Sequence, residues 1–595
     1  MAKVRIFLTE LSGNRNFRAR DGRGFPTVQF SGSMTENKER FLSLRIIKFF
    51  KAAIRLLSHA PSRSYGATAL SFGIVTLLLY LTGLSADPSL ATVVIGGVFV
   101  LLSLPFLPSE RPIPLVLQDF AVTDYVFFDF FCIKRFNKME TAKRVPIVIS
   151  ILAGAILALV GLVYPIRLVS FLLGAVIFVG ITLLSPEFAF FTTFLVLPYM
   201  SLVPSSTVIF ASIILLTVLS FARKAYFGKR FACIDGYDAI IGVLMVLVLV
   251  SGIFEKGMSS FTWSVGMVLM GFGYIISGNV VTNRRLADRA LNSIVISSVP
   301  PAVIGIVAFV RELASGRGAQ LIDKGVSSTF PNSEAAAAFT VVALFFSFAQ
   351  LIQSHGAKKI FYAAVFAVQF AFLALTGELF AVLALLLGVI AYGFIRAFRG
   401  AVVFLPVISV LPYAILILPN RLLDKIFSVI PSLESSGELF GTWGASLSAF
   451  VRNIMFGIGL GENCFAEEMA DAGITAKNSS NIFIELGLEA GFFALACFVA
   501  LLVVRIFHKA GYNSYVRNSE VSVLSPICSV CVYSLVAYGA FNYVFADMFS
   551  MYLFWCVFGI GSAALRVAKR ETDDRIHYYE DTRASNSSAI DIEIL

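Results

Sequence analysis

The chain has 595 residues, of which 58% are hydrophobic and 14% charged, and Phe alone occupies 58 positions. A soluble protein carries about 25% charged residues, so this composition excludes a soluble enzyme, a disordered protein and a secreted disulfide scaffold. The net charge of +10 would suggest nucleic acid in a soluble chain. Here runs of about 20 apolar residues recur along most of the length, which indicates a polytopic membrane protein without a nucleic-acid partner.

The two ends of the chain are polar. Residues 1–39 are basic and lack the pattern of a cleavable signal peptide, which predicts a disordered cytoplasmic tail and a first span that serves as its own insertion signal. Residues 40–60 place Arg45, Lys48 and their neighbours on one helical face, which predicts an amphipathic helix on the anionic cytoplasmic leaflet. The polar composition of residues 567–595 predicts a second cytoplasmic tail, disordered from about residue 572.

Between these ends the apolar runs predict an all-α protein with about 16 transmembrane helices (14 to 16) in 66–419 and 481–566. The run at 188–203 is short enough to be partly re-entrant. Cys528 and Cys531 form a C-x-x-C inside an apolar run, which is typical of core packing rather than of redox chemistry. The predicted spans are 66–83, 90–107, 146–163, 167–184, 188–203, 206–222, 238–254, 263–280, 290–310, 334–353, 360–377, 379–395, 401–419, 481–504, 521–541 and 547–566.

The distribution of Lys and Arg predicts the orientation of these spans. With the N-terminus in the cytoplasm, 38 of the 47 basic residues fall on the cytoplasmic side and nine outside. Such a bias follows the positive-inside rule. Both termini are therefore expected on the cytoplasmic side of the membrane. Two long segments face outward, 311–333 and 420–480, and the second is a large extracytoplasmic loop before the third-last span.

Three short motifs lie near these outward segments. Phe456-Gly-Ile-Gly-Leu-Gly461 follows Trp443 and is followed by Ser480-Asn481 and by Glu489-Ala-Gly491. Ser328-Thr-Phe-Pro-Asn332 opens one span, and Leu375-Thr-Gly-Glu-Leu-Phe-Ala381 forms a turn between two others. In order and spacing, over roughly residues 290–560, these motifs resemble the O-antigen ligase/polymerase family, of which this chain would be a divergent member.

The resemblance implies an inverting glycosyltransferase of a bacterial cell (inner) membrane that needs no metal or other cofactor. Such a protein joins undecaprenyl-pyrophosphate-linked oligosaccharide into a surface polysaccharide, or transfers it to an acceptor. The expected partners are this lipid-linked oligosaccharide, membrane lipid and polysaccharide assembly proteins. A lipid-linked donor enters sideways from the bilayer while its sugars stay in water, so the site belongs at the outer membrane face.

The chain departs from the family pattern at several positions. Ser480 stands where the family has His before Asn481, Leu379 replaces an Arg, and Leu439 stands where another Arg is expected. All four His residues fall on the predicted cytoplasmic side. Either another residue acts as general base, or the chain no longer catalyses. Glu462, directly after Gly461, and Asn481 are the catalytic candidates.

Departure of a pyrophosphate requires fixed positive charge nearby. The outward cations are therefore the candidates for substrate binding, although each could instead face lipid headgroups or end a helix. They are Arg452, Arg421, Lys425, Lys477, Arg311 and Arg317.

Two other functions remain open at this point. A transporter places charged or helix-broken sites near the bilayer midplane, whereas the spans here are almost free of charge. A carrier or flippase for lipid-linked sugar is therefore the second hypothesis. The third is a catalytically inactive scaffold of the polysaccharide assembly machinery.

Overall fold

The computed structural model describes most of the chain between residues 60 and 593. The predicted tail 1–39 and interfacial helix 40–60 lie outside the described residues, except for 27–28 and Ala60. Within the described part the protein is helical, apart from a two-residue antiparallel pair formed by β1 (Thr27–Val28) and β2 (Ala232–Cys233). The all-α prediction is therefore confirmed. The described ranges are 27–28, 60–87, 89–133, 135, 146–226, 232–233, 236–254, 257–315, 325–398, 404–417, 436–470, 472–516 and 523–593.

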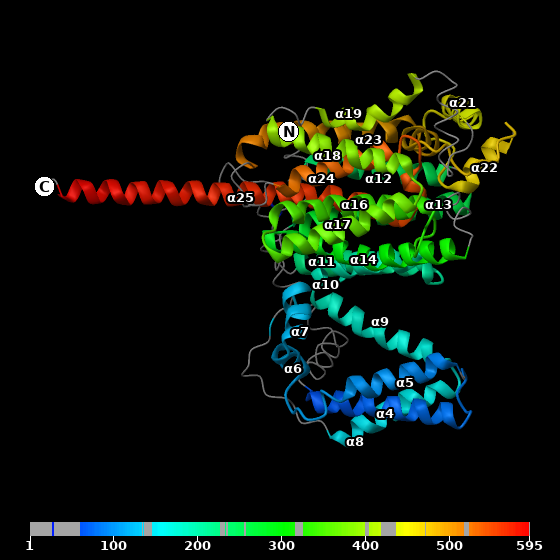
Figure 1. The fold of residues 1–595 in the computed structure, drawn as a ribbon, viewed down its shortest axis with the longest axis vertical. Helices are drawn as coiled ribbons and strands as arrows, with labels where there is room; N and C mark the ends of the chain where they lie inside the picture. Colours follow the sequence, from blue (N-terminus) through cyan, green and yellow to red (C-terminus); the bar gives the residue numbers. More distant parts are fainter. Residues whose placement is uncertain are drawn as a thin grey trace, which may run out of the picture. The chain divides into compact units, whose positions relative to one another are not determined.

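The helices divide into two compact units (Figure 1), which are described separately. The first unit extends to Ala189 and includes the end of α11 from Leu219. Its elements are α4 (Ser62–Leu81), α5 (Leu90–Ser103), α6 (Ile113–Asp119), α7 (Ala121–Thr123), the π-helical η1 (Asp124–Phe130), α8 (Ile147–Leu159), the 3-10 turn η2 (Val160–Leu162) and α9 (Ile166–Leu184).

Small and hydroxyl residues hold the first unit together around α4. The Thr68 and Ser71 hydroxyls donate to the carbonyls of Ser150 (3.0 Å) and Ile151 (2.6 Å) on α8. A Cβ at Gly154 would overlap the Thr68 carbonyl, so the two backbones touch. In a membrane, where lipid is as apolar as Leu, helices associate through such close backbone approach and interhelical hydrogen bonds.

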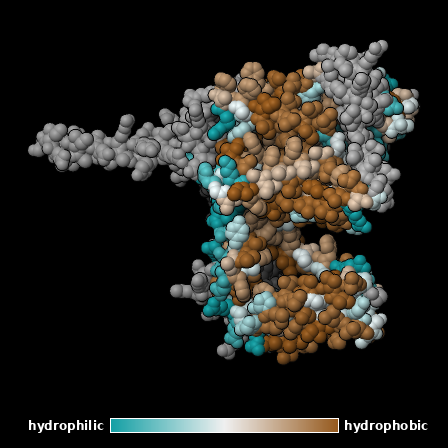
Figure 2. All heavy atoms as spheres, viewed as in Figure 1, coloured by the Kyte–Doolittle hydropathy of each residue, from teal (hydrophilic) through white to brown (hydrophobic). Residues whose placement is uncertain are grey.

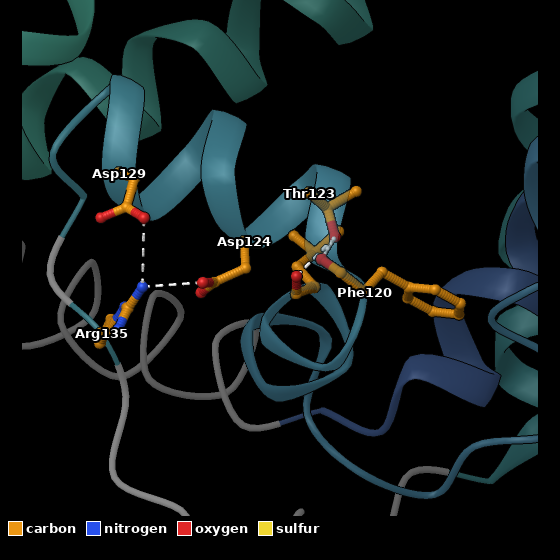
Figure 3. Close-up of polar contacts among 6 residues, drawn as sticks. Phe120, Thr123, Asp124, Asp129 and Arg135 are labelled. Carbon is orange, nitrogen blue, oxygen red and sulfur yellow. Dashed lines mark hydrogen bonds and ion pairs between the residues drawn. The ribbon is translucent and has the colours of Figure 1, made fainter.

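The segment after α6 is held by one arginine (Figure 3). The Arg135 guanidinium binds the Asp124 carboxylate at 2.7 Å and the Asp129 carboxylate at 3.6 Å, so it ties two turns of η1 together. The Thr123 hydroxyl donates to the carbonyl of Phe120 at 3.1 Å, and the Phe120 ring is 52% exposed. These bonds fix the backbone of a segment whose Phe120 side chain lies on the side away from Arg135 (Figure 3).

The second unit contains Phe190–Val218 and every helix from α12 onward. Helices α10 (Pro186–Val196) and α11 (Ser206–Tyr226) have residues in both units. The other elements are η3 (Leu197–Leu202), α12 (Gly236–Phe254), α13 (Met258–Val280), α14 (Arg284–Ala314), α16 (Ser333–Gln353), α17 (Ala357–Leu375), α18 (Leu379–Ala397), α19 (Leu405–Val410), η5 (Leu411–Ile417), α21 (Ser436–Arg452), α22 (Glu462–Ala470), α23 (Ile482–Val516), α24 (Leu524–Tyr538), η7 (Val544–Ala546) and α25 (Met548–Glu593).

Two helices form the centre of the second unit. The apolar windows of α25 and α16 are 94% and 83% buried, whereas that of α17 is 22% buried. Helix α25 packs on α13 through small residues, because a Cβ at Gly559 would overlap the Tyr274 carbonyl. Cys528 and Cys531 form no disulfide and are fully buried, which confirms that they belong to the core.

Ten of the described helices are long and apolar enough to cross a membrane, and five more are apolar but shorter. On the face shown in Figure 2, apolar side chains cover much of the described surface of each unit. The run at 188–203 belongs to neither group, because α10 ends at Val196 and the backbone continues as a 3-10 turn through Pro198. These helices indicate a membrane-embedded protein, and the total of about 16 spans stays a prediction.

The C-terminal half of the chain differs from expectation at two places. Helix α25 continues to Glu593, where the composition predicts disorder from about 572. Helix propagation is cooperative, so a buried spanning helix extends readily into a following polar stretch. Arg505, which directly follows the predicted span 481–504, is only 2% exposed. Its guanidinium donates to the Ser529 hydroxyl and the Phe558 carbonyl.

Candidate functional site

The glycine motif forms a short extended segment against a break in α23. Gly457, Gly459 and Gly461 all have positive φ, as does Gly491, where α23 kinks. The kink exposes carbonyls that the helix no longer uses. The amides of Ile458 and Gly459 donate to the carbonyls of Leu488 (2.9 Å) and Glu489 (3.2 Å).

The positive φ angles explain why glycines occupy these positions. A Cβ at Gly457 would overlap the Glu489 carbonyl, and one at Gly491 would overlap the Met455 carbonyl. Irregular backbone is tolerated at membrane depth only where protein satisfies its hydrogen bonds. The Ser251 hydroxyl on α12 also donates to the Glu489 carbonyl, at 2.7 Å, so this carbonyl accepts a further hydrogen bond from the protein.

Glu489 connects the glycine segment to the loop before α25. Its two carboxylate oxygens accept from the Gly461 amide at 2.9 Å and from the Tyr543 hydroxyl at 2.5 Å. The side chain is buried, and a buried carboxylate is costly unless donors satisfy it. Both oxygens are therefore engaged in holding two loops on α23.

A small cavity adjoins this clamp. Its polar lining comes from Glu462, Lys477, Asn478, Glu485, Glu489 and Tyr543, and Trp263 forms one wall. A Cβ at Gly461 would lie 2.6 Å from the Trp263 ring, so the glycine is what lets the ring close on the motif. The cavity has a volume of about 20 Å³. A space of this size holds about one water molecule.

The other two motifs lie at the same end of the second unit. The Val326 amide donates to the Leu375 carbonyl at 3.0 Å, and the Ser333 hydroxyl donates to the Glu378 carboxylate at 2.9 Å. Glu334 interacts electrostatically with both Glu378 and Lys477. Lys477, which lines the cavity beside the glycine motif, is therefore within electrostatic range of Glu334. The structure thus brings together all three segments that carry the resemblance.

Asn481 forms the start of α23. Its side-chain oxygen accepts from the amides of Phe483 (3.0 Å) and Ile484 (3.1 Å), as an N-cap residue does. Its side-chain nitrogen donates to the Tyr413 hydroxyl (2.8 Å) and to the Ala540 carbonyl (2.9 Å). All the hydrogen-bonding capacity of this buried amide is thus used to hold the helix start in place, which favours a structural role.

The predicted substrate-binding cations are placed differently from one another. Lys477 lines the cavity, as does the catalytic candidate Glu462. Arg452 is 65% exposed at the end of α21 and pairs with Glu468 at 3.0 Å, away from the cavity lining. Arg311 is exposed in the last turn of α14. Arg317, Arg421 and Lys425 lie outside the described residues.

Sequence reasoning missed three residues of the cavity. These residues are Glu485, Trp263 and Tyr543, none of which lies within one of the three motifs. Trp263 lies near the start of α13, about 200 residues before the glycine motif. Tyr543 lies 54 residues after Glu489. Of the three, only Glu485 has a signal in the sequence, because it is a carboxylate inside an apolar run at the end of the span where the active site is expected.

The site offers carboxylates, one ammonium, a phenol and an indole wall. Within the described residues, no three His, Cys, Asp or Glu side chains are grouped as metal ligands. The arrangement can accept a proton, hold an anion at Lys477 and contact an apolar or sugar face at Trp263. No protein-family model matches the chain, and no curated protein is significantly similar to it.

Proposed function

We propose that this protein is a membrane glycosyltransferase of the O-antigen ligase/polymerase type, which acts on undecaprenyl-pyrophosphate-linked oligosaccharide at the outer face of a bacterial cell membrane. The single observation that carries the proposal is the proximity of the three motif segments: two of them are joined by the bond from Ser333 to Glu378, and the third lines a small polar cavity with Lys477, which interacts electrostatically with Glu334. Those segments were identified from sequence spacing alone. Their proximity supports the resemblance, since unrelated spans have no reason to present matched segments to one another.

The chemistry of the cavity suits transfer from a pyrophosphate. A leaving pyrophosphate is stabilised by a fixed positive charge in a site shielded from water. Lys477 supplies a positive charge in the cavity lining although the residue is exposed, whereas the charge of Arg452 is paired with Glu468. We therefore rank Lys477 above Arg452 as the pyrophosphate contact. Glu462, Glu485 and Glu489 supply carboxylates beside it.

The cavity must widen for substrate to bind. A volume of about 20 Å³ admits one water and no sugar ring. The segments around it are joined largely by side-chain bonds such as that from Tyr543 to Glu489, so widening need not break the helices themselves. The proposed reaction accordingly includes an opening step before the donor enters.

The test compares surface polysaccharide in a deletion strain with and without the gene restored. The wild-type gene should restore long chains, and Lys477→Ala should not do so at normal protein levels. Lys358→Ala, at the start of α17, is the matched control and should behave as wild type. Long chains of normal amount in the deletion strain itself would refute the proposal.

The carrier hypothesis gains support from one observation. Glu334, Glu378, Glu485 and Glu489 are carboxylates within or at the ends of membrane helices, where ionisable groups often serve transport. For a carrier, deletion would trap lipid-linked precursor on the cytoplasmic leaflet. For a transferase, short unjoined oligosaccharide would accumulate outside. A scaffold would tolerate alanine at every charged site residue although its deletion abolished the polymer.

A further inference from the structure

The carboxylates of the cavity differ in the segments to which they are hydrogen-bonded. Both oxygens of Glu489 accept hydrogen bonds, from Gly461 and from Tyr543. Glu485 lies one helical turn earlier and lines the same cavity. Among the described residues its hydrogen-bond donor is Ser479, whose amide lies 2.7 Å from one carboxylate oxygen and whose hydroxyl also interacts with the carboxylate. Each carboxylate oxygen can accept two hydrogen bonds, so Glu485, which is bonded to Ser479 alone among the described residues, retains acceptor capacity.

The burial of Glu485 makes this spare capacity significant. The side chain is 1% exposed, although it faces a cavity with room for about one water. The Ser479 bond fixes the carboxylate against the loop that precedes α23. The Trp443 indole in turn fixes that loop by donating to the Ser479 carbonyl at 2.7 Å. Glu485 is thus an oriented acceptor in a shielded site, which is the arrangement that general-base catalysis requires.

We propose that Glu485 is the general base that activates the acceptor hydroxyl, and that Glu489 and Tyr543 are positioning residues that hold the glycine segment beside it. This inference rests on the transferase function proposed above. It replaces Glu462, which is the exposed first residue of α22. A base at an exposed position is surrounded by water, and this water would compete with the acceptor hydroxyl for the donor sugar.

The reaction balances with the groups present in the chain and its substrates. The acceptor hydroxyl oxygen attacks the anomeric carbon of the donor sugar, and a new C–O bond forms there. The bond between this carbon and the pyrophosphate oxygen breaks, and its electron pair leaves with the lipid pyrophosphate, beside Lys477. The hydroxyl proton passes to the Glu485 carboxylate and is then released to water.

The alternative is a purely structural role for Glu485, because its carboxylate accepts a hydrogen bond from the loop before its own helix. The Glu485→Gln variant separates the two readings. The glutamine oxygen can accept the same bond from the Ser479 amide, so a purely structural role predicts a stable and active protein. A general-base role predicts a stable and inactive one, because an amide takes no proton.

The experiment measures sugar transfer by the full-length protein in proteoliposomes, with a synthetic polyprenyl-pyrophosphate oligosaccharide as donor. Glu485→Gln should lower kcat by at least about 100-fold, the scale of general-base catalysis, and leave the donor KM within about twofold. Wild-type activity should fall on the acidic side of its pH profile, and the residual activity of the variant should not. Glu467→Gln, an exposed substitution on α22, should match the wild type.

The outcomes keep the inference distinct from the proposed function. Transfer by the wild type with full activity in Glu485→Gln would overturn the role of Glu485 and leave the function standing. Loss in Glu462→Gln with activity retained in Glu485→Gln would assign the base to Glu462 instead. The absence of any transfer by the folded wild-type protein would count against the function itself.

Discussion

Gly457→Ala tests whether the glycine segment is held against the kink of α23. Gly457 has a φ of +77°, and an added Cβ would overlap the carbonyl oxygen of Glu489. Left-handed backbone costs a non-glycine residue about 1–2 kcal/mol. Moving the segment away to relieve the overlap weakens the bonds to Leu488 and Glu489, and each hydrogen bond contributes about 0.5–1.5 kcal/mol. Gly457→Ala should therefore lower the free energy of unfolding by about 2–5 kcal/mol.

Two other glycines in the same part of the chain separate the contributions. Gly473 has a φ of +69° with open space around it, so Gly473→Ala should show the backbone strain alone, about 1–2 kcal/mol. Gly441 is helical and also has open space, so Gly441→Ala should be neutral or stabilising by up to about 1 kcal/mol.

The assay is chemical unfolding of the purified protein in detergent, followed by tryptophan fluorescence. The expected order of destabilisation is Gly457→Ala, then Gly473→Ala, then Gly441→Ala. If Gly457→Ala is no more destabilising than Gly473→Ala, the close contact with Glu489 is absent in solution and the reasoning fails.

Three further substitutions probe the bonds around this site and elsewhere. Tyr543→Phe removes a 2.5 Å bond to a buried carboxylate, so it should lower the free energy of unfolding by about 1.5–3 kcal/mol in the same assay. Arg505→Lys cannot keep the bonds to Ser529 and Phe558 together, and it should lower the thermal midpoint by several degrees while the exposed Arg311→Lys has no effect. Arg167 holds the pKa of the Asp87 carboxyl below its ordinary value. The ion pair therefore contributes its full stability at pH values above the ordinary pKa of Asp, and this stability is lost as the pH falls through the lowered pKa of Asp87. Thermal midpoints measured from neutral pH into acid should therefore show a small deficit in Asp87→Asn that disappears in acid, and a deficit independent of pH would contradict this.

The spans were predictable because each is a local run of apolar residues. Ten long apolar helices follow from composition within a window, without reference to the rest of the chain. The kink in α23 was not predictable in this way, since an apolar run continues through Gly491. Only the approach of the glycine segment, which supplies amides to the released carbonyls, makes the break at this position stable.

In the candidate site too, local features were predictable and contacts between distant segments were not. Lys477 and Glu462 were predictable because they lie beside recognisable motifs, and both line the cavity. The spacing also singled out Asn481, but the partners that occupy its side chain, Tyr413 and Ala540, lie 68 and 59 residues away. Sequence spacing cannot show whether distant segments satisfy a side chain or leave it free to act.

The orientation of the second unit is the claim on which the proposed function most depends, and site-directed labelling tests it directly. A membrane-impermeant maleimide is applied to cells with an intact cell membrane, in a variant whose native cysteines have been replaced. Lys477→Cys, at the cavity, should react, whereas His355→Cys, after the end of α16, should react only when the membrane is opened. Labelling of residue 355 and protection of residue 477 in intact cells would place the cavity in the cytoplasm and contradict sugar-chain transfer at the outer face.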